Sequence, residues 1–268
     1  MTVIASNMKL ANNADINSLY LEQKVKDIYK KVAQNPGGKF HFETGRQLAE
    51  RLGYPKGLLD RIPAEAINSF SGVGYYFHLA NLQAGESVID LGSGSGMDSF
   101  IASILVGDTG QVIGVDMTDE QLIKAECLRI QANINNVHYF KSYIQSTLCK
   151  DESMDVVISN GVINLAPDKS EVFHEAERLL KPGGRIVLSD IVTTGQLPEN
   201  IICDSNLWTA CIGGAIHIND YIGAINSAGF IVESIEDNIE YQFISENNQD
   251  AIIEYGIKSI SLIARKRY

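Results

Sequence analysis

Hydrophobic residues along this chain follow two different spacings, and the change between them divides the sequence into two parts. Over Leu19–Val32 the apolar residues recur at helical spacing, and Gly37-Gly38 interrupts the pattern. A second helix is predicted over Thr44–Leu52, followed by a turn at Tyr54-Pro55-Lys56-Gly57. We therefore expect residues 1–80 to form a mostly helical N-terminal cap.

From Ser87 onward, short apolar runs alternate with longer segments of helical spacing. The expected strands are Ser87–Leu91, Gln111–Val115, Val137–Lys141, Met154–Ser159, Arg185–Ile191, Ile231–Tyr241 and Lys258–Lys266. The expected helices are Met97–Leu105, Asp119–Asn133, Lys169–Leu180, Asn200–Thr209, Ile218–Ala228 and Asn248–Tyr255. This alternation predicts an α/β fold over residues 81–268, with a mostly parallel seven-stranded sheet and helices on both faces. The last two strands are close in sequence, which favours an antiparallel pair at one edge of the sheet.

Two short runs predict where individual helices begin and end. Thr118-Asp119-Glu120-Gln121 has the pattern of a capping box, so a helix should start there. Lys181-Pro182-Gly183-Gly184 should end the helix before the fifth strand, because a glycine C-cap commonly has a proline nearby.

Composition narrows the class of protein. The 268 residues are 45% hydrophobic and 21% charged, as in globular domains, and the net charge is −11. An acidic chain does not suit nucleic acid or an anionic membrane surface, because both need clustered Lys and Arg. No apolar run approaches the roughly 20 residues of a membrane helix. Met1–Asn7 also lacks the features of a secretory signal, so we expect a cytoplasmic protein.

Cysteine spacing agrees with that expectation. The four cysteines, Cys127, Cys149, Cys203 and Cys211, are scattered and form no CxxC pair. This spacing predicts neither a disulfide framework nor a metal site. Thiols that stay reduced are typical of the cytoplasm.

The most specific chemistry lies in Val88–Gly96, where an apolar strand runs into a glycine-rich loop. The dinucleotide-binding pattern G-x-G-x-x-G fits in neither register, and no Walker lysine follows. Asp90, at the end of the strand, would repel a pyrophosphate. It would suit a cation such as the ammonium or sulfonium of S-adenosylmethionine. The candidate contacts to this cofactor in the loop are Gly92, Ser93, Gly94 and Gly96.

A second carboxylate, Asp116, follows the next predicted strand. A carboxylate at that place accepts hydrogen bonds from both hydroxyls of an adenosine ribose. Met117 beside it is placed to pack on the adenine face. The alternative is that the glycines only close a turn and that Asp116 only caps a helix.

Val88–Gly96 together with Asp116 resembles the first two motifs of class I S-adenosylmethionine-dependent methyltransferases. Three further runs resemble the arsenite methyltransferase family: Tyr143-Ile144-Gln145, Ile158–Lys169 and Leu207–Ala215. The resemblance covers roughly residues 25–230. It implies a Rossmann-like methyltransferase fold with S-adenosylmethionine as the cofactor.

The resemblance also implies roles for single residues. Ile144, next to Tyr143, would contact adenine, and Asn160 would line the methionine end of the cofactor. Tyr29 would close over the cofactor from the N-terminal helix. The run Asn164–Lys169 has a second interpretation, because it also suits the start of a helix.

The acceptor site is where this chain departs from the family it resembles. Arsenite methyltransferases hold trivalent arsenic, which is soft, with a small set of cysteine thiolates. Cys211 matches one of these positions, but Gly161 and Val73 stand where the resemblance implies two more cysteines. Cys203 does not replace them if it shares a helix with Cys211, because eight residues rise about 12 Å. Cys211 is therefore either a single arsenic ligand or a small buried hydrophobic residue.

Other side chains near the expected acceptor pocket, between the cap and residues 190–220, each have a structural alternative. His217 is either a general base or a surface histidine. Asp190, in the fifth predicted strand, either contributes to the acceptor site or caps a turn. Tyr75 and Tyr76 either line an apolar pocket or pack in the core.

Three functions follow from these alternatives. In the first, which the missing cysteines favour, the protein methylates a small organic molecule on an arsenite-methyltransferase-like scaffold. In the second, it methylates arsenite carried as a thiol conjugate, with Cys211 as the one protein ligand. In the third, it binds the cofactor as a catalytically silent regulatory subunit. For an enzyme, alignment of donor and acceptor supplies several of the roughly 7–11 kcal/mol available from orientation.

Overall fold

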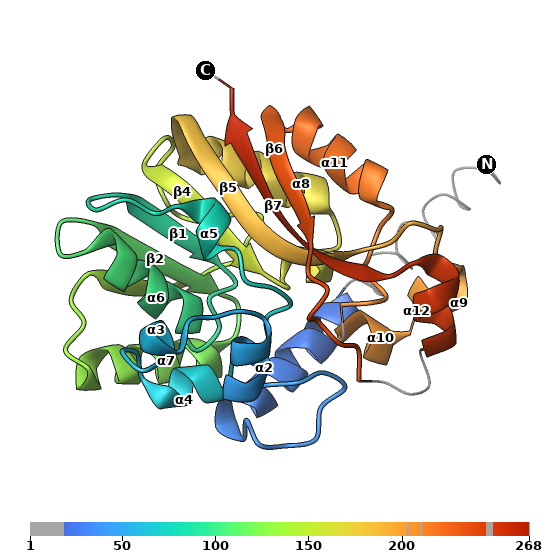
Figure 1. Cartoon of the computed structure of the whole chain (residues 1–268), viewed down its shortest axis with the longest axis horizontal. Helices are drawn as coiled ribbons and strands as arrows, with labels where there is room; N and C mark the ends of the chain where they lie inside the picture. The colour runs from blue at the N-terminus through green and yellow to red at the C-terminus, as the bar shows by residue number, and fades with distance from the viewer. Residues whose placement is uncertain (1–18, 203, 210, 245–248, 268) are drawn as a thin grey trace, which may run out of the picture.

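A seven-stranded sheet forms the centre of the molecule (Figure 1), in a computed structural model that describes residues 19–202, 204–209, 211–244 and 249–267. The strands are β1 (Ser87–Leu91), β2 (Gln111–Asp116), β3 (Val137–Lys141), β4 (Met154–Asn160), β5 (Leu180–Val192), β6 (Phe230–Asp237) and β7 (Lys258–Lys266). Their order in the sheet is β3-β2-β1-β4-β5-β7-β6. β1 to β5 pair in parallel, and β7 pairs antiparallel with both β5 and β6. The predicted Rossmann-like α/β fold, with an antiparallel pair at one edge, is confirmed.

Helices cover both faces of this sheet. They are α6 (Met97–Val106), α7 (Asp119–Gln131), α8 (Lys169–Leu179) and α11 (Ile218–Ser227), and α12 (Gln249–Tyr255) joins β6 to β7. Successive side chains of a strand point to opposite faces, so Val88 belongs to the core with α6, and Ile89 to the core with α8 and α11. On the second face, the rings of Phe173 and Tyr221 pack edge to face with centroids 5.3 Å apart. Among the described residues, no helix is long and apolar enough to cross a membrane.

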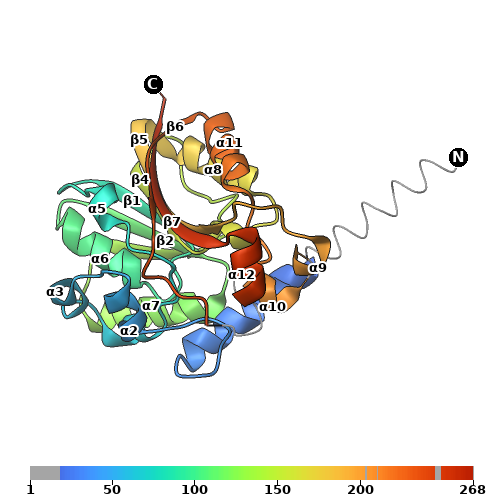
Figure 2. The same cartoon turned by 45° about the vertical axis from the view of Figure 1, so that its right-hand side comes forward.

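Helices of the N-terminal region pack on α7 and on the strands β5 and β7. They are the helix over residues 19–34, α2 (Arg46–Arg51), α3 (Lys56–Leu59), α4 (Ala64–Asn68) and α5 (Phe77–Ala80). Leu48, Leu59 and Ile67 pack into the same core as α6. The helix over 19–34 lies beside α10 (Ser205–Thr209) in Figures 1 and 2. Leu21 and Val25 contact Trp208 there, so this helix closes one side of the space above the sheet.

Two predictions about helices and turns were wrong in detail. The turn expected at Tyr54-Pro55-Lys56-Gly57 continues into α3, because Pro55 is an extended N-cap that favours a helix after it. The single helix expected over Asn200–Thr209 is divided into α9 (Glu199–Ile202) and α10. Asp204 accepts a hydrogen bond from the Leu207 backbone N–H at 3.1 Å and so starts a new helix. Cys203 lies outside the described residues.

The two predicted caps also differ from the structure. Thr118 precedes α7 but makes no side-chain cap hydrogen bond, and the Gln121 side chain bonds Ser95 and the Tyr29 carbonyl. α8 ends at Leu180, whose backbone is extended. Gly183, with φ +75°, lies inside β5 where its pairing with β4 is irregular, and is not the cap itself.

Candidate cofactor and acceptor site

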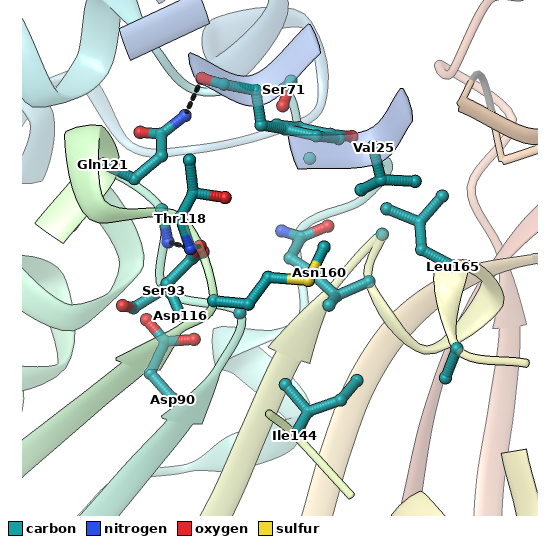
Figure 3. Close-up of a pocket in the computed structure, with 18 of the residues that line it drawn as sticks. Val25, Ser71, Asp90, Ser93, Asp116, Thr118, Gln121, Ile144, Asn160 and Leu165 are labelled. Atoms are coloured by element: carbon teal, nitrogen blue, oxygen red, sulfur yellow. Dashed lines mark hydrogen bonds between the residues drawn. The ribbon is translucent and has the colours of Figure 1, made fainter. Parts of the chain in front are cut away.

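A pocket of about 340 Å³ lies at the carboxyl ends of the parallel strands. Its walls come from the helix over 19–34, the segment 66–72, the loops that follow β1 to β4, and the region of α9 and α10. Figure 3 shows Asp90 and Asp116 on one side of the pocket and Val25 and Leu165 on the other. The pocket therefore combines a polar side, built by the first two strands, with an apolar side.

Most of the cofactor contacts predicted from sequence line this pocket. They are Tyr29, Asp90, Gly92, Ser93, Gly94, Asp116, Met117, Tyr143, Ile144 and Asn160. Gly96 is not among the lining residues, but it is the N-cap of α6 with φ +93°, and a Cβ there would collide with Tyr139. Its contribution is to let the loop turn into α6.

The glycine loop leaves space and polar atoms at the pocket wall. Gly92 has φ +79°, and a Cβ at this position would collide with Val162. The Ser93 hydroxyl is buried and has no hydrogen-bond partner among the described residues. A buried hydroxyl normally has a partner, so its position in the wall suits a ligand atom.

Asp116 is held by two backbone amides. Its Oδ1 accepts from the Thr118 N–H at 2.8 Å, and its Oδ2 accepts from the Gly94 N–H at 3.0 Å. Burial raises the pKa of this carboxyl, and these hydrogen bonds oppose the shift. Each oxygen keeps a lone pair for a further donor, which fits the two hydroxyls of a ribose.

Asp90 is 2% exposed and accepts one hydrogen bond from the Ser99 hydroxyl at 2.6 Å. Burial, and next the negative charge of Asp98, raise the pKa of Asp90 to about 8. The carboxylates that line the pocket are Glu22, Asp90, Asp98 and Asp116, whereas no Lys, Arg or His is present in the described lining. The pocket therefore favours a cationic ligand, and S-adenosylmethionine is a cation at its sulfonium and ammonium groups.

The helix over 19–34 is tied to both sides of the pocket mouth. From the β3 side, the Tyr143 hydroxyl donates to Glu22 at 2.8 Å and accepts from Lys26 at 3.0 Å. From the α7 side, the Gln121 amide donates to the Tyr29 carbonyl at 2.9 Å. These contacts place Tyr29 in the pocket wall, as the resemblance implies.

The three positions that bear on arsenic meet at one place. The Cys211 thiol donates to the Gly161 carbonyl oxygen at 3.2 Å. A Cβ on Gly161 would lie 3.3 Å from Val73 Cγ1. Cys211 is 5% exposed, and burial, with a smaller contribution from Asp190, raises the pKa of its thiol. Only one thiol stands at this place among the described residues, and burial favours its protonated form.

The sequence predicts that Cys211, Asp190 and His217 face the acceptor, but none of them lines the pocket. His217 is the N-cap of α11, and its Nδ1 accepts from the backbone N–H of residue 219 at 3.2 Å. Asp190 is buried and accepts from the Tyr221 hydroxyl at 2.9 Å and the Asn164 N–H at 3.0 Å. Burial raises the pKa of Asp190 to about 6. In this geometry, His217 and Asp190 hold backbone segments in position.

Sequence reasoning missed Asp98, which lines the pocket two residues after the last glycine of the loop. Its carboxylate accepts from the hydroxyls of Tyr54 and Tyr76 at 2.7 and 2.9 Å. Tyr76 therefore packs in the core, and Tyr75 lies outside the pocket wall against the Tyr54 ring. Its position two residues after Gly96 is the feature of the sequence that could have indicated a place in the pocket wall.

Trp208 is a second lining residue that sequence reasoning did not assign to the site. It lines the apolar side of the pocket together with Leu21, Val25 and Leu165. It belongs to the run that resembles arsenite methyltransferases. With Ile202, it places part of the region of residues 190–220 in the pocket wall.

Known proteins with similar sequences are methyltransferases. A family model described as "Methyltransferase domain" matches residues 82–256. An arsenite methyltransferase of Halobacterium salinarum is 38% identical over 231 residues, which are 86% of this chain and 59% of that protein. An arsenite methyltransferase of Aquipseudomonas alcaligenes is 37% identical, over 78% of this chain and 62% of that protein. The chain thus spans about three fifths of the length of these curated relatives.

A solved structure agrees with these matches. The crystal structure of an arsenic (III) S-adenosylmethionine methyltransferase from Chlamydomonas reinhardtii superposes with a TM-score of 0.66 at 31% identity. The match covers 80% of this chain and 73% of that one.

Proposed function

The chain belongs to the class I S-adenosylmethionine-dependent methyltransferases and resembles the arsenite methyltransferases among them. From this premise we propose that it methylates a small organic acceptor. The cofactor supplies a methyl group that is already activated on a sulfonium. Asp116 would hold the ribose hydroxyls, and Ile144 and Met117 would pack on adenine. Asp90 would face the cationic methionine end. The protein then needs mainly to align the acceptor with the methyl group.

The single observation that carries the choice of acceptor is that, among the described residues, Cys211 is the one cysteine at the place where it meets Gly161 and Val73. Trivalent arsenic binds thiolates, and the chain has valine and glycine at the other two positions, Val73 and Gly161. Burial raises the pKa of Cys211, and its thiol donates to a carbonyl oxygen. In the described part of the chain, no group of three or more His, Cys, Asp or Glu is placed to hold a metal ion. This site would hold arsenic poorly.

The apolar side of the pocket supports an organic acceptor. Phe70, Leu165, Pro167 and Trp208 line it and offer hydrocarbon and aromatic surface. Burial of apolar surface stabilises a bound ligand by about 25 cal/mol per Å². The carboxylates elsewhere in the wall disfavour an anionic acceptor.

A second candidate is arsenite carried as a thiol conjugate. The names of the curated relatives favour it, since both proteins described above are arsenite methyltransferases. In that case Cys211 would be the one protein ligand to arsenic, and the other ligands would come from the conjugate.

An assay of S-adenosylhomocysteine release distinguishes the two candidates. Arsenite with glutathione is tested beside a panel of small phenols, amines and carboxylic acids, with the whole chain and with Cys211→Ser. We expect turnover with a member of the organic panel and only background formation of methylated arsenic. A robust rate on arsenite that Cys211→Ser abolishes would establish the second candidate instead.

We also propose that the protein works in the cytoplasm. Cys127, Cys149 and Cys211 are free cysteines in the structure. Free thiols persist in reducing compartments. Fractionation of the native host cells tests this location directly.

A further inference from the structure

Asp98 is a buried carboxylate in the pocket wall. It lies in the first turn of α6 and is 5% exposed. It does not serve that helix as a cap, because the N-cap is Gly96 and no side chain caps the helix N-terminus. Its burial is therefore not explained by a capping role in α6.

Three uncharged donors hold the Asp98 carboxylate. The Tyr54 hydroxyl donates to Oδ1 at 2.7 Å, and the Tyr76 hydroxyl donates to Oδ2 at 2.9 Å. The Asn160 amide donates to Oδ2 at 3.1 Å. Oδ2 thus has two donors, whereas Oδ1 has one and keeps a lone pair.

Asn160 is itself fixed by the backbone of the neighbouring segment. Its Oδ1 accepts from the Val73 N–H at 2.8 Å, and its Nδ2 also donates to the Gly74 carbonyl at 3.0 Å. The carboxylate of Asp98 is therefore held in one orientation by groups from three separate parts of the chain. A charged group that is buried and fixed, yet paired only with neutral donors, is stabilised strongly by a bound cation.

Asp90 and Asp98 line the same pocket, and the negative charge of Asp98 contributes to the raised pKa of Asp90. Burial also raises the pKa of Asp98, although its three donors oppose that shift. A cationic ligand favours the charged form of both buried carboxylates.

We propose that Asp98 is a counter-charge for the α-ammonium group of S-adenosylmethionine, and that Tyr54 and Tyr76 are positioning residues that hold its carboxylate. Asp90, near the carboxyl end of β1, then serves the same cationic end of the cofactor. This role depends on the cofactor alone, so it is independent of which acceptor is methylated.

Calorimetry with three ligands tests the proposal on the whole chain. S-adenosylmethionine and S-adenosylhomocysteine both carry the ammonium group, whereas 5′-methylthioadenosine has the adenosine and sulfur but no amino acid. Asp98→Asn removes the charge and keeps the size of the side chain. We expect it to weaken both amino-acid ligands by about tenfold or more, the usual effect of losing a hydrogen bond between charged groups. Binding of 5′-methylthioadenosine should change less than twofold, which also shows that the variant is folded.

Tyrosine variants test the positioning role. Tyr76→Phe removes one donor to Asp98 and should weaken the two amino-acid ligands severalfold without affecting 5′-methylthioadenosine. Tyr75→Phe is the matched control, because Tyr75 neighbours Tyr76 and lies outside the pocket wall. It should change none of the three affinities.

Two outcomes would overturn the proposal. Equal weakening of all three ligands by Asp98→Asn would show that Asp98 only supports the structure of the pocket. Unchanged affinity for S-adenosylmethionine and S-adenosylhomocysteine would show that the carboxylate does not meet the ammonium. Neither outcome bears on the proposed organic acceptor, which turnover measures separately.

Discussion

The sulfur of Cys211 lies 3.2 Å from the carbonyl oxygen of Gly161, to which its thiol donates a hydrogen bond. A Cβ on Gly161 would lie 3.3 Å from Val73 Cγ1. Three segments that are far apart in sequence therefore meet at one point. Cys211 is the single thiol that the described residues bring to this point, whereas trivalent arsenic is held by a set of thiolates. The surroundings of Cys211 therefore favour packing over arsenic binding.

Cys211→Ser should act on stability and leave cofactor binding unchanged. A serine hydroxyl can still donate to Gly161, but its burial costs about 1 kcal/mol relative to the thiol because the hydroxyl is more polar. Urea unfolding measures the loss, and calorimetry measures the affinity for S-adenosylmethionine. A large loss of affinity with unchanged stability would contradict the assignment of Cys211 to the packed core.

Asp116→Ala should abolish measurable binding of S-adenosylmethionine. The variant removes both oxygens that the Gly94 and Thr118 amides hold toward the pocket. Two hydrogen bonds to a charged group are worth about 3–6 kcal/mol together, which is at least about a 100-fold change in affinity. Unchanged affinity by calorimetry would show that the ribose lies elsewhere. Thr147→Ala, at a buried hydroxyl that bonds Glu175, is a control for general destabilisation.

The sequence predicted the sheet and the polar side of the pocket well, because both depend on local patterns. Alternating strands and helices have distinct spacings. Asp90 and Asp116 lie near the carboxyl ends of two strands, which must lie together in a parallel sheet. The predicted capping box is absent, but it drew attention to a residue that matters for the pocket. The Gln121 side chain bonds the Tyr29 carbonyl and the Ser95 hydroxyl of the glycine loop.

The apolar side and the buried network were harder to predict, because they join residues that are distant in sequence. Asp98 meets Tyr54 and Tyr76 only after the N-terminal helices pack beside α6. His217 and Asp190 have side chains suited to catalysis. In the structure, however, His217 caps α11, and Asp190 accepts a hydrogen bond from Tyr221 in the core. Residue type alone does not distinguish these roles.

Asp90 should make the stability of the cofactor-free protein depend on pH. Its pKa rises from 3.8 to about 8 on folding, so the folded state holds a proton that the unfolded state has lost between those values. The stabilisation is complete below about pH 4 and is lost as pH rises toward 8, by at most about 1.4 kcal/mol per pH unit.

Unfolding curves of the wild type and Asp90→Asn between pH 5 and pH 8.5 test this dependence. The wild type should lose stability relative to the variant as pH rises, because the amide does not titrate. Asp190 also titrates near pH 6, but it is present in both proteins and cancels in the difference. Saturating S-adenosylmethionine should reduce the slope, since a cation favours the ionised carboxylate. Parallel curves without cofactor would exclude the raised pKa.

Tyr143→Phe should speed release of the cofactor. The phenol joins Glu22 and Lys26 of the helix over 19–34, and the variant keeps the ring while losing both hydrogen bonds. Exposed polar contacts contribute about 0.2–1 kcal/mol, so the dissociation rate should rise by a factor of about five at most. Stopped-flow displacement measures that rate. Lys258→Ala breaks an exposed ion pair with Asp237, away from the pocket, and should leave the rate unchanged.

Restoring the two missing thiols should convert the chain into an arsenic binder. Val73→Cys with Gly161→Cys would place three thiols at the point where these residues meet Cys211. Gly161 has φ +69°, so its replacement costs about 1–2 kcal/mol of stability. Arsenite affinity should nevertheless rise at least about 100-fold, because the added ligands act at one site.

Fluorescence of Trp208, the one tryptophan of the chain, reports arsenite binding from the pocket wall. The serine pair, Val73→Ser with Gly161→Ser, is the matched control, because it has the same backbone strain and no added thiols. If the wild type bound arsenite as tightly as the cysteine pair, Cys211 alone would suffice and arsenite would become the preferred acceptor. If neither bound it, the three positions would not be close enough to share one arsenic atom. If only the variant with Val73→Cys and Gly161→Cys bound arsenite, the absence of thiols at these two positions would explain why the wild type does not bind it.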